Sequence, residues 1–159
     1  MKQSTPGFPV VRWGDNLATF FSHEAPEDSK YYAVVVFTWT DKGWLVANIP
    51  NRGWCVPSGR IEAGETPIET AHREAFEEVG ATLKQLKPVG HYRFMSDIGA
   101  ETLMPTFVSL VEKVEPIPQG SESLGIRYLK PDELRENYWR WDELLESMFG
   151  YAQAIAESL

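Results

Sequence analysis

The sequence has little cysteine and no long hydrophobic run. Cys55 is the single cysteine, which excludes an internal disulfide and is typical of a reducing compartment. The longest apolar run, residues 33–37, has the length of a strand and is far below the roughly 20 residues of a membrane helix. The first residues, MKQSTPGFPVV, contain no apolar segment typical of a secretory signal. We therefore expect a cytoplasmic protein without a membrane partner.

Positive charge is also scarce. Lysine and arginine number 15 against 23 aspartates and glutamates, which gives a formal net charge of −8. Nucleic-acid polymers and anionic membranes are bound by basic patches, so neither partner is expected. A small anionic molecule remains compatible, because a bound divalent cation inverts the local field. A length of 159 residues without repeats or linkers predicts a single domain over residues 1–159.

Alternating β-branched and aromatic residues predict a protein rich in strands. The predicted strands cover residues 13–21, 31–40, 44–49, 84–95, 102–114 and 125–130. Helices are predicted over residues 67–79, from Pro131, and from about Trp139 to the end of the chain. Strands combined with one central and one terminal helix predict an α/β fold, an α/β/α sandwich with a mixed sheet.

The central helix has clear borders in the sequence. Thr66 and Glu69 form a capping-box pattern, Pro67 suits the first helical position, and Gly80 suits a left-handed residue after the last turn. One apolar stripe at helical spacing is predicted to pack on the sheet, formed by Ile68, Ala71, Ala75 and Val79.

Three glutamates of this helix, Glu74, Glu77 and Glu78, converge at spacings of three and four residues. One interpretation is a solvated acidic face, with Arg73 pairing to Glu69 or Glu77. However, carboxylates this close repel one another unless a proton or cation neutralises them. Oxygen ligands of this kind suit Mg²⁺ or Mn²⁺, so the spacing also indicates a metal site that faces outward from the helix.

Residues 59–81, GRIEAGETPIETAHREAFEEVGA, resemble the Nudix box, G-x5-E-x7-R-E-U-x-E-E-x-G-U, where U is a bulky aliphatic residue. Every fixed position is filled, by Gly59, Glu65, Arg73, Glu74, Glu77, Glu78 and Gly80. The departures are Ala75 and Ala81, which are smaller than the usual aliphatic residues. The resemblance also extends to the predicted sandwich fold.

This resemblance implies an enzyme, a Mg²⁺-dependent pyrophosphohydrolase that can also use Mn²⁺. Its substrates would be small molecules in which a nucleoside diphosphate is linked to another group. The implied metal ligands are Glu74, Glu77, Glu78 and the Gly59 carbonyl. A later acidic residue often joins them in the family, and Glu122 is favoured over Glu101, Glu112 and Glu115; a solvated loop acid is the alternative for each.

The resemblance also implies catalytic roles for Arg73, Glu74 and Glu77. Glu74 is favoured as the general base, and Arg73 would orient the glutamates by ion pairing. Glu65 would brace the junction between loop and helix. Arg52 and Arg60 flank the Pro57-Ser58-Gly59 turn and are candidates to bind substrate phosphates, with ordinary surface arginines as the alternative.

Aromatic residues outside the motif allow two interpretations. Some residues of the predicted strands can stack on a base, although core packing is the preferred role for most of them (Tyr32, Trp39, Trp44, Tyr92 and Phe107). Trp139 and Trp141 are predicted to pack the terminal helix on the sheet. Cys55 is predicted to pack rather than to act as a nucleophile.

The favoured reaction is hydrolysis of a nucleoside triphosphate, with an oxidised one such as 8-oxo-dGTP as a candidate, to nucleoside monophosphate and pyrophosphate. Nucleotide sugars, ADP-ribose and dinucleoside polyphosphates stay open as substrates. A Nudix-fold module that binds a nucleotide without turnover is the alternative from another class, and a chance motif in an interaction domain is a third. A homodimer is compatible with so small a sandwich.

Overall fold

The computed structural model describes residues 7–26, 29–96 and 98–159. Within these residues, nine strands form one mixed sheet in the order β1-β2-β7-β8-β3-β4-β5, with β6 paired to β3 and β9 paired to β4. The strands are β1 (Val11–Trp13), β2 (Asn16–Phe21), β3 (Ala33–Thr40), β4 (Gly43–Ile49), β5 (Gly53–Cys55), β6 (Ser58–Arg60), β7 (Ala81–Met95), β8 (Glu101–Val114) and β9 (Ile126–Leu129). The helices are α1 (Pro67–Val79), α2 (Leu134–Asn137) and α3 (Glu143–Ser158), and a 3₁₀ turn, η1 (Pro131–Glu133), precedes α2.

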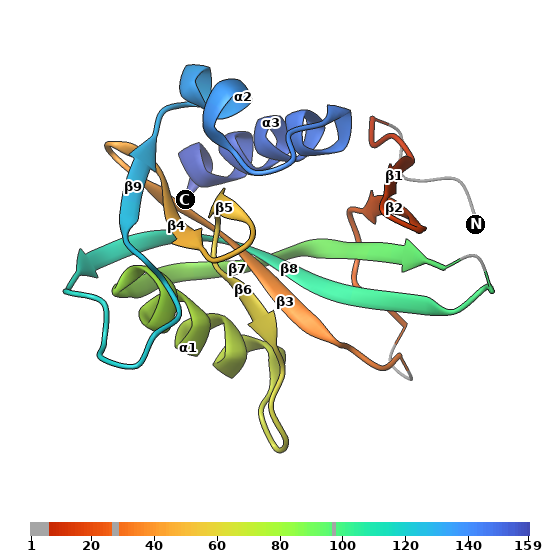
Figure 1. Cartoon of the computed structure of the whole chain (residues 1–159), viewed down its shortest axis with the longest axis horizontal. Helices are drawn as coiled ribbons and strands as arrows, with labels where there is room; N and C mark the ends of the chain where they lie inside the picture. Colours follow the sequence, from red (N-terminus) through yellow and green to blue (C-terminus); the bar gives the residue numbers. More distant parts are fainter. Residues whose placement is uncertain (1–6, 27–28, 97) are drawn as a thin grey trace.

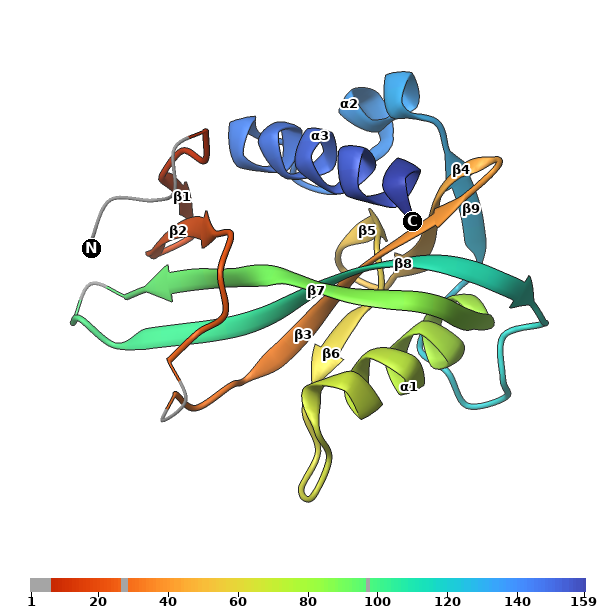
Figure 2. The same ribbon diagram turned by 180° about the vertical axis from the view of Figure 1, so that it is seen from behind.

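The sheet lies between two helical layers. Helix α1 covers one face, and α2 and α3 lie on the opposite side (Figure 1); the view from behind shows the same separation (Figure 2). The predicted α/β/α sandwich with a mixed sheet is therefore confirmed. None of the helices among the described residues has the length and hydrophobicity needed to span a bilayer. The cytoplasmic location and the homodimer stay predictions.

Helix α1 packs closely on the sheet through small residues. Ala71, Ala75 and Val79 are fully buried, in one cluster with the β3 residues Val34 and Val36. The prediction that Ile68 also packs on the sheet is wrong, because its side chain is 50% exposed. It has the right angular position, but it lies in the first turn, and the buried side of the helix begins only at Thr70.

The other face of the sheet is covered by α3. Its inner residues form one core cluster with the aromatic residues of the sheet, and the rings of Phe37 and Phe149 are 5.0 Å apart. The prediction that this helix begins near Trp139 is wrong. The helix begins at Glu143, after Asp142 accepts a 2.8 Å hydrogen bond from the Leu145 N–H as its N-cap. Arg140, with φ of +52°, interrupts any helical path before that point.

Two further strand predictions need correction. The single strand predicted over residues 13–21 is a hairpin, β1 and β2, because Gly14 turns the chain with φ of +61°. The predicted strand over residues 84–95 begins earlier, at Ala81. Strands β7 and β8 form a long antiparallel pair whose register shifts between Lys84 and Lys87, where Gln85 has φ of +54°.

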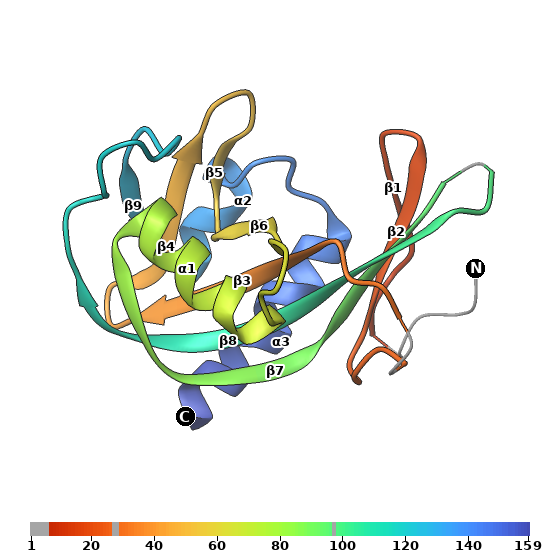
Figure 3. The same ribbon diagram turned by 90° about the horizontal axis from the view of Figure 1, so that it is seen from below.

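Strand β6 brings Gly59, the first glycine of the motif, into the sheet. Strands β3 and β4 pair only near their turn, at Trp39 with Trp44 and at Thr40 with Gly43. Further along β3, the partner is β6, with Val34 opposite Gly59 and Val35 opposite Ser58. Residues 58–60 therefore lie in the sheet beside α1, as the view from below shows (Figure 3).

Candidate active site

The borders of α1 are as predicted from the sequence. The Thr66 hydroxyl accepts from the Glu69 N–H at 3.1 Å, and the Glu69 carboxylate accepts from the Thr66 N–H at 3.0 Å. Gly80 ends the helix with φ of +70° and donates to the Phe76 carbonyl at 2.9 Å. A Cβ atom on Gly80 would lie 1.9 Å from the Glu115 carbonyl oxygen, so a side chain is excluded there. Both ends of the helix are thus fixed by the motif itself.

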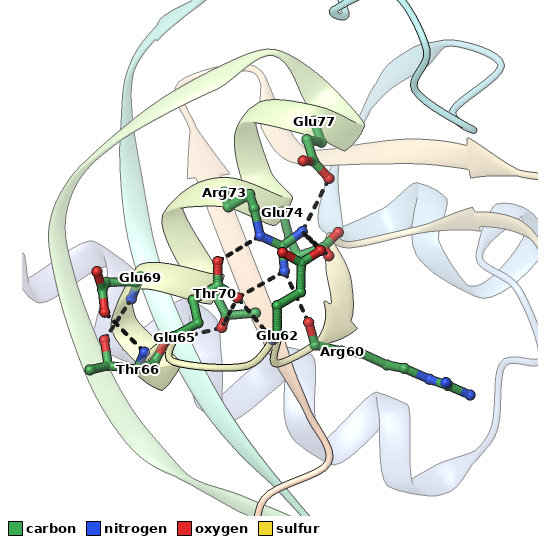
Figure 4. Close-up of polar contacts among 9 residues, drawn as sticks. All are labelled: Arg60, Glu62, Glu65, Thr66, Glu69, Thr70, Arg73, Glu74 and Glu77. Atoms are coloured by element: carbon green, nitrogen blue, oxygen red, sulfur yellow. Dashed lines mark hydrogen bonds and ion pairs between the residues drawn. The ribbon is translucent and has the colours of Figure 1, made fainter.

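Arg73 is the centre of a polar network on this helix (Figure 4). Its Nε and Nη2 atoms donate to the two carboxylate oxygens of Glu65 at 2.7 and 2.9 Å. Its Nη1 atom donates to Glu74 at 2.8 Å and to Glu77 at 3.2 Å. Nη2 also donates to the Arg60 carbonyl at 3.0 Å. One guanidinium group therefore joins β6 and the following loop to two glutamates of α1.

Glu65 is held firmly as an anion. Besides the paired bonds from Arg73, it accepts from the Thr70 hydroxyl at 2.6 Å and from the Glu62 N–H at 3.2 Å. Hydrogen bonds from Arg73 first, and from Thr70 second, lower the pKa of Glu65 to about 2. The carboxylate therefore ties the loop to the helix.

Glu78 and Glu74 have the opposite environment. The prediction that they face outward is wrong: Glu78 is 4% and Glu74 9% exposed, and both are turned toward β6. The Ser58 N–H donates to Glu78 at 3.2 Å. A Cβ atom on Gly59 would lie 2.2 Å from the Glu74 carboxyl carbon, so the glycine makes room for this carboxylate. Glu77 remains half-exposed, with 46% of its side chain accessible.

Burial controls the titration of this pair. Burial first, and the charge of Glu74 second, raise the pKa of Glu78 to about 9. Burial also raises the pKa of Glu74, although the Arg73 charge opposes that shift. The two carboxyl groups influence each other's titration directly. At neutral pH such a pair retains a proton unless a cation takes its place.

The pair has the chemistry of a partial site for a hard divalent cation. Its atoms are carboxylate oxygens that are buried and close together, with the single Arg73 guanidinium at Glu74, which suits Mg²⁺ or Mn²⁺. Over residues 7–26, 29–96 and 98–159, no three histidine, cysteine, aspartate or glutamate side chains are grouped closely enough to enclose a metal ion. Arg73 contacts both Glu74 and Glu77, and it is the burial of Glu74 and Glu78, against the half-exposed Glu77, that makes them the close pair.

Glu122 is the candidate from outside the helix that the structure brings to this pair. It is exposed, in the loop between β8 and β9, and its charge contributes to the raised pKa of Glu78. The neighbouring Ser121 hydroxyl donates to the Glu77 carbonyl at 2.7 Å. This bond anchors the loop to the last full turn of α1.

The competing acids are placed elsewhere. Glu101 is 3.7 Å from Arg93, near the far end of the β7–β8 pair. Glu115 is 3.8 Å from Lys113. Glu112 is an exposed residue of β8. Of the four acids weighed from the sequence, Glu122 therefore has the strongest structural support.

A cavity of about 360 Å³ lies next to the glutamate pair. Ser58 connects the two, because it lines the cavity while its N–H donates to Glu78. Six of the fourteen residues of its wall are aromatic, namely Trp13, Phe37, Tyr92, Phe94, Tyr138 and Trp139. Cys55 is buried in the same wall, and burial raises the pKa of its thiol to about 12, which fits its predicted packing role.

Sequence reasoning missed the part of this wall that precedes α3. Trp139 was expected to pack on the sheet, but it lines the cavity, while Trp141 stacks on Phe149 at 5.7 Å in the core. Tyr138 accepts a 3.0 Å hydrogen bond from the Val56 N–H. The available signal was the aromatic and basic run at residues 138–141, which was interpreted as one helix face.

The two predicted phosphate-binding arginines differ in position. Arg52 lines the cavity, with its guanidinium carbon 5.9 Å from the centre of the Trp139 ring. Arg60 lies over Tyr32 at 5.0 Å, and its side chain points away from the glutamates (Figure 4). At the carboxylate network, Arg60 contributes its backbone carbonyl alone.

Comparison with known proteins agrees with this geometry. The family model described as NUDIX domain matches residues 29–148. A Bacillus subtilis protein provisionally described as an 8-oxo-dGTP diphosphatase, YtkD, is 35% identical over 121 residues, covering 74% of each chain. A nucleoside triphosphate pyrophosphatase/Nudix hydrolase fusion protein of Bifidobacterium longum is 30% identical over 127 residues. That match covers 77% of this chain and 25% of the fusion protein.

Solved structures share the fold. The pyrophosphohydrolase BsRppH of Bacillus subtilis aligns with a TM-score of 0.72 and 24% identity, covering 90% of this chain and 92% of that one. A NUDIX hydrolase from Nitrosomonas europaea aligns with a TM-score of 0.64 and 22% identity, covering 79% and 90%. At these identities, the likeness establishes the sandwich architecture.

Proposed function

We propose that this chain, which belongs to the Nudix hydrolase family, is a Mg²⁺-dependent pyrophosphohydrolase that converts nucleoside triphosphates to nucleoside monophosphates and pyrophosphate. The family membership and the class of hydrolase confirm the resemblance seen in residues 59–81. The observation that carries the proposal is the junction at Ser58, where the buried Glu74–Glu78 pair meets an aromatic cavity.

The metal site of this proposal combines the pair with nearby oxygens. Glu74, Glu78 and the Gly59 carbonyl form its inner part, and Glu77 and Glu122 complete it from the solvent side. Mg²⁺ is usually held by a few carboxylates together with substrate phosphates, which agrees with a site that is only partly enclosed. When bound, the ion would neutralise phosphate oxygens and lower the pKa of its water.

The residues of the chain then supply positioning and proton transfer. Glu74 is the proposed general base, and the bond from Arg73 Nη1 holds its carboxylate in place for that role. Arg73 fixes Glu74 and Glu77 relative to the loop through the bonds described above. Arg52, at the cavity beside Ser58, is proposed to bind a phosphate group.

The aromatic cavity is proposed to receive the base. Its volume lies within the range of small-molecule pockets, and aromatic side chains offer faces on which bases stack. The relative described as an 8-oxo-dGTP diphosphatase and an oxidised purine nucleoside triphosphate hydrolase of mouse, 28% identical over 93 residues, support a purine triphosphate as substrate.

The test is a Mg²⁺-dependent hydrolysis screen with product identification. The panel contains dGTP, 8-oxo-dGTP, other nucleoside triphosphates, nucleotide sugars, ADP-ribose and dinucleoside polyphosphates. Release of pyrophosphate and monophosphate from a triphosphate, abolished by EDTA and restored by Mg²⁺, is the expected result. Turnover confined to another substrate class, or binding without any turnover, would overturn the proposal.

A further inference from the structure

The cavity has an uneven supply of hydrogen-bonding groups. Arg52 and Arg140 are among its lining residues, and the guanidinium group of an arginine can only donate. Among the described residues that line it, none is an aspartate, glutamate, asparagine or glutamine. The carboxylate of Asp142, two residues after Arg140, already accepts hydrogen bonds from the Trp13 indole and the Leu145 N–H. A ligand edge in this cavity therefore meets side chains rich in donors and poor in acceptors.

Left-handed backbone occurs at Arg140 and at the residue before Arg52. Within the described part of the chain, three residues other than glycine have positive φ; one of them lines this cavity and another directly precedes a lining residue. Arg140 itself has φ of +52°, and Asn51, immediately before Arg52, has φ of +66°. A bulky residue in the left-handed region is uncommon and persists where surrounding structure fixes it.

That surrounding structure is well defined. The Trp139 N–H donates to the Trp54 carbonyl at 2.9 Å, and Tyr138 forms a bridge with Trp54. The Trp139 ring has two cationic neighbours, with guanidinium carbons 5.2 Å away for Arg140 and 5.9 Å away for Arg52. The segment at residues 138–140 is thus pinned to β5 while it presents Arg140 at the cavity.

We propose that Arg140 selects the base, by donating to a purine that carries an oxygen at position 6 rather than an amino group. Guanine and hypoxanthine present acceptors at O6 and N7, which match the paired donors of a guanidinium group. Adenine presents an amino group at position 6, and the described residues of the lining offer no side-chain carboxylate or amide oxygen to accept from it. The three purines have similar size, so the group at position 6 decides which of them is preferred.

This inference rests on the proposed function for the identity of the ligand, and it adds the base class and the residue that selects it. Trp139 and the other aromatic residues provide stacking that any base can use. Arg140 provides the discrimination. A single wrong or missing pairing of this kind typically changes affinity by about 5- to 150-fold.

The experiment compares GTP, ITP and ATP, of which the first two share the oxygen at position 6 and ITP lacks the 2-amino group. In the wild-type chain with Mg²⁺, kcat/KM for GTP and ITP should exceed that for ATP by at least about 10-fold. Arg140→Met should reduce this ratio to below about 3-fold by lowering the GTP and ITP values, and Arg140→Lys should restore only part of it. Arg135→Met is the matched control, because Arg135 is exposed on α2 and pairs with Glu146 at 2.7 Å; it should keep the full ratio.

Binding of the non-hydrolysable α,β-methylene analogues of the same three nucleotides separates the two proposals. An intact GTP-type preference in binding, lost in Arg140→Met, without any turnover would sink the proposed function and support the role of Arg140. Turnover of triphosphates with equal kcat/KM for GTP and ATP, or a preference that Arg140→Met leaves unchanged, would overturn the role of Arg140 alone. Circular dichroism of each variant confirms that the fold is retained.

Discussion

Glu65 and Glu78 belong to one motif, yet their surroundings drive them in opposite directions. Glu65 accepts hydrogen bonds from Arg73 and Thr70, which lower its pKa to about 2. Glu78 is buried against Glu74, which raises its pKa to about 9. Glu65 is thus satisfied by the protein alone, whereas Glu78 is not. The difference separates a carboxylate that holds the structure from one that is available to a cation.

The strongest test of this contrast is Glu78→Gln. Loss of the buried carboxylate should lower Mg²⁺-dependent kcat/KM by at least about 100-fold, because it removes a proposed metal ligand. Steady-state hydrolysis of the best triphosphate from the screen measures the effect. Wild-type activity in this variant would contradict the assignment.

The stability of Glu78→Gln provides a second measurement with a defined sign. The folded-state pKa of about 9 lies above the ordinary value of 4.5. The contribution of this carboxyl group to the free energy of unfolding is therefore fully present below pH 4.5 and is lost as the pH rises through 9. In EDTA, the melting temperature of Glu78→Gln relative to that of the wild type should therefore increase as the pH is raised from 6 to 9. Mg²⁺ should raise the wild-type melting temperature and leave that of the variant nearly unchanged. A full Mg²⁺ response in the variant would argue against Glu78 as a ligand.

Gly59→Ala tests the space around the other buried carboxylate. The new Cβ atom would lie 2.2 Å from the Glu74 carboxyl carbon, so Glu74 must move and kcat should fall by about 10- to 100-fold. Gly150→Ala is the matched control, because it lies within α3 with nothing within 4 Å of the added atom. It should leave kcat unchanged and raise the free energy of unfolding by about 0.5–1 kcal/mol. Equal activity of the two variants would refute the close fit at Gly59.

Glu65→Gln should have a smaller effect on catalysis, about 10-fold in kcat, because Glu65 acts on the glutamates through Arg73. Its larger signature is in acid. With a folded-state pKa of about 2, below the ordinary 4.5, the stabilisation by this group is present above pH 4.5 and is lost as the pH falls toward 2. Urea unfolding at pH 5 and pH 3 should show that the free energy of unfolding falls less in Glu65→Gln than in the wild type. Parallel losses in both proteins would show that the Arg73 pairing contributes little to stability.

The smallest effect is expected for Ile68→Gln, which tests the corrected face of α1. Since Ile68 is half-exposed, the free energy of unfolding should change by less than about 0.5 kcal/mol. Ala71→Leu, three residues further along, should destabilise by about 1–3 kcal/mol, because Ala71 is fully buried against the sheet. Chemical denaturation of both variants measures the difference. A loss of unfolding free energy at Ile68 as large as at Ala71 would show that Ile68 packs on the sheet as first predicted.

Local signals in the sequence were enough to predict the borders of α1 and the positions of most strands. The cap at Thr66 and the stop at Gly80 depend on residues within a few positions, and both are as predicted. The burial of Glu74 and Glu78 was missed, because it depends on β6 filling the gap between β3 and β4. Helical spacing shows which side chains share a face but not what covers that face.

The cavity was beyond the reach of sequence reasoning for a similar cause. Its wall joins residues from β1, from the turn near Arg52 and from the segment before α3, which are far apart in the chain. The left-handed backbone at Arg140 is also unexpected for an arginine between two tryptophans. Such features follow from long-range pairing, as at Tyr138 and Trp54, and leave no periodic pattern in the sequence.

The hydrogen bond between the Trp13 indole and the Asp142 carboxylate has a consequence for how such a protein can diversify. It joins the first hairpin to the N-cap of the last helix at the edge of the cavity, whereas the glutamates come from the middle of the chain. Substitutions near the two outer elements can therefore reshape the room for a ligand without altering the carboxylate network. If the proposals above hold, the outer wall of the cavity and the glutamates are encoded in separate stretches of sequence that meet at Ser58, so the outer wall can change while the glutamates are preserved.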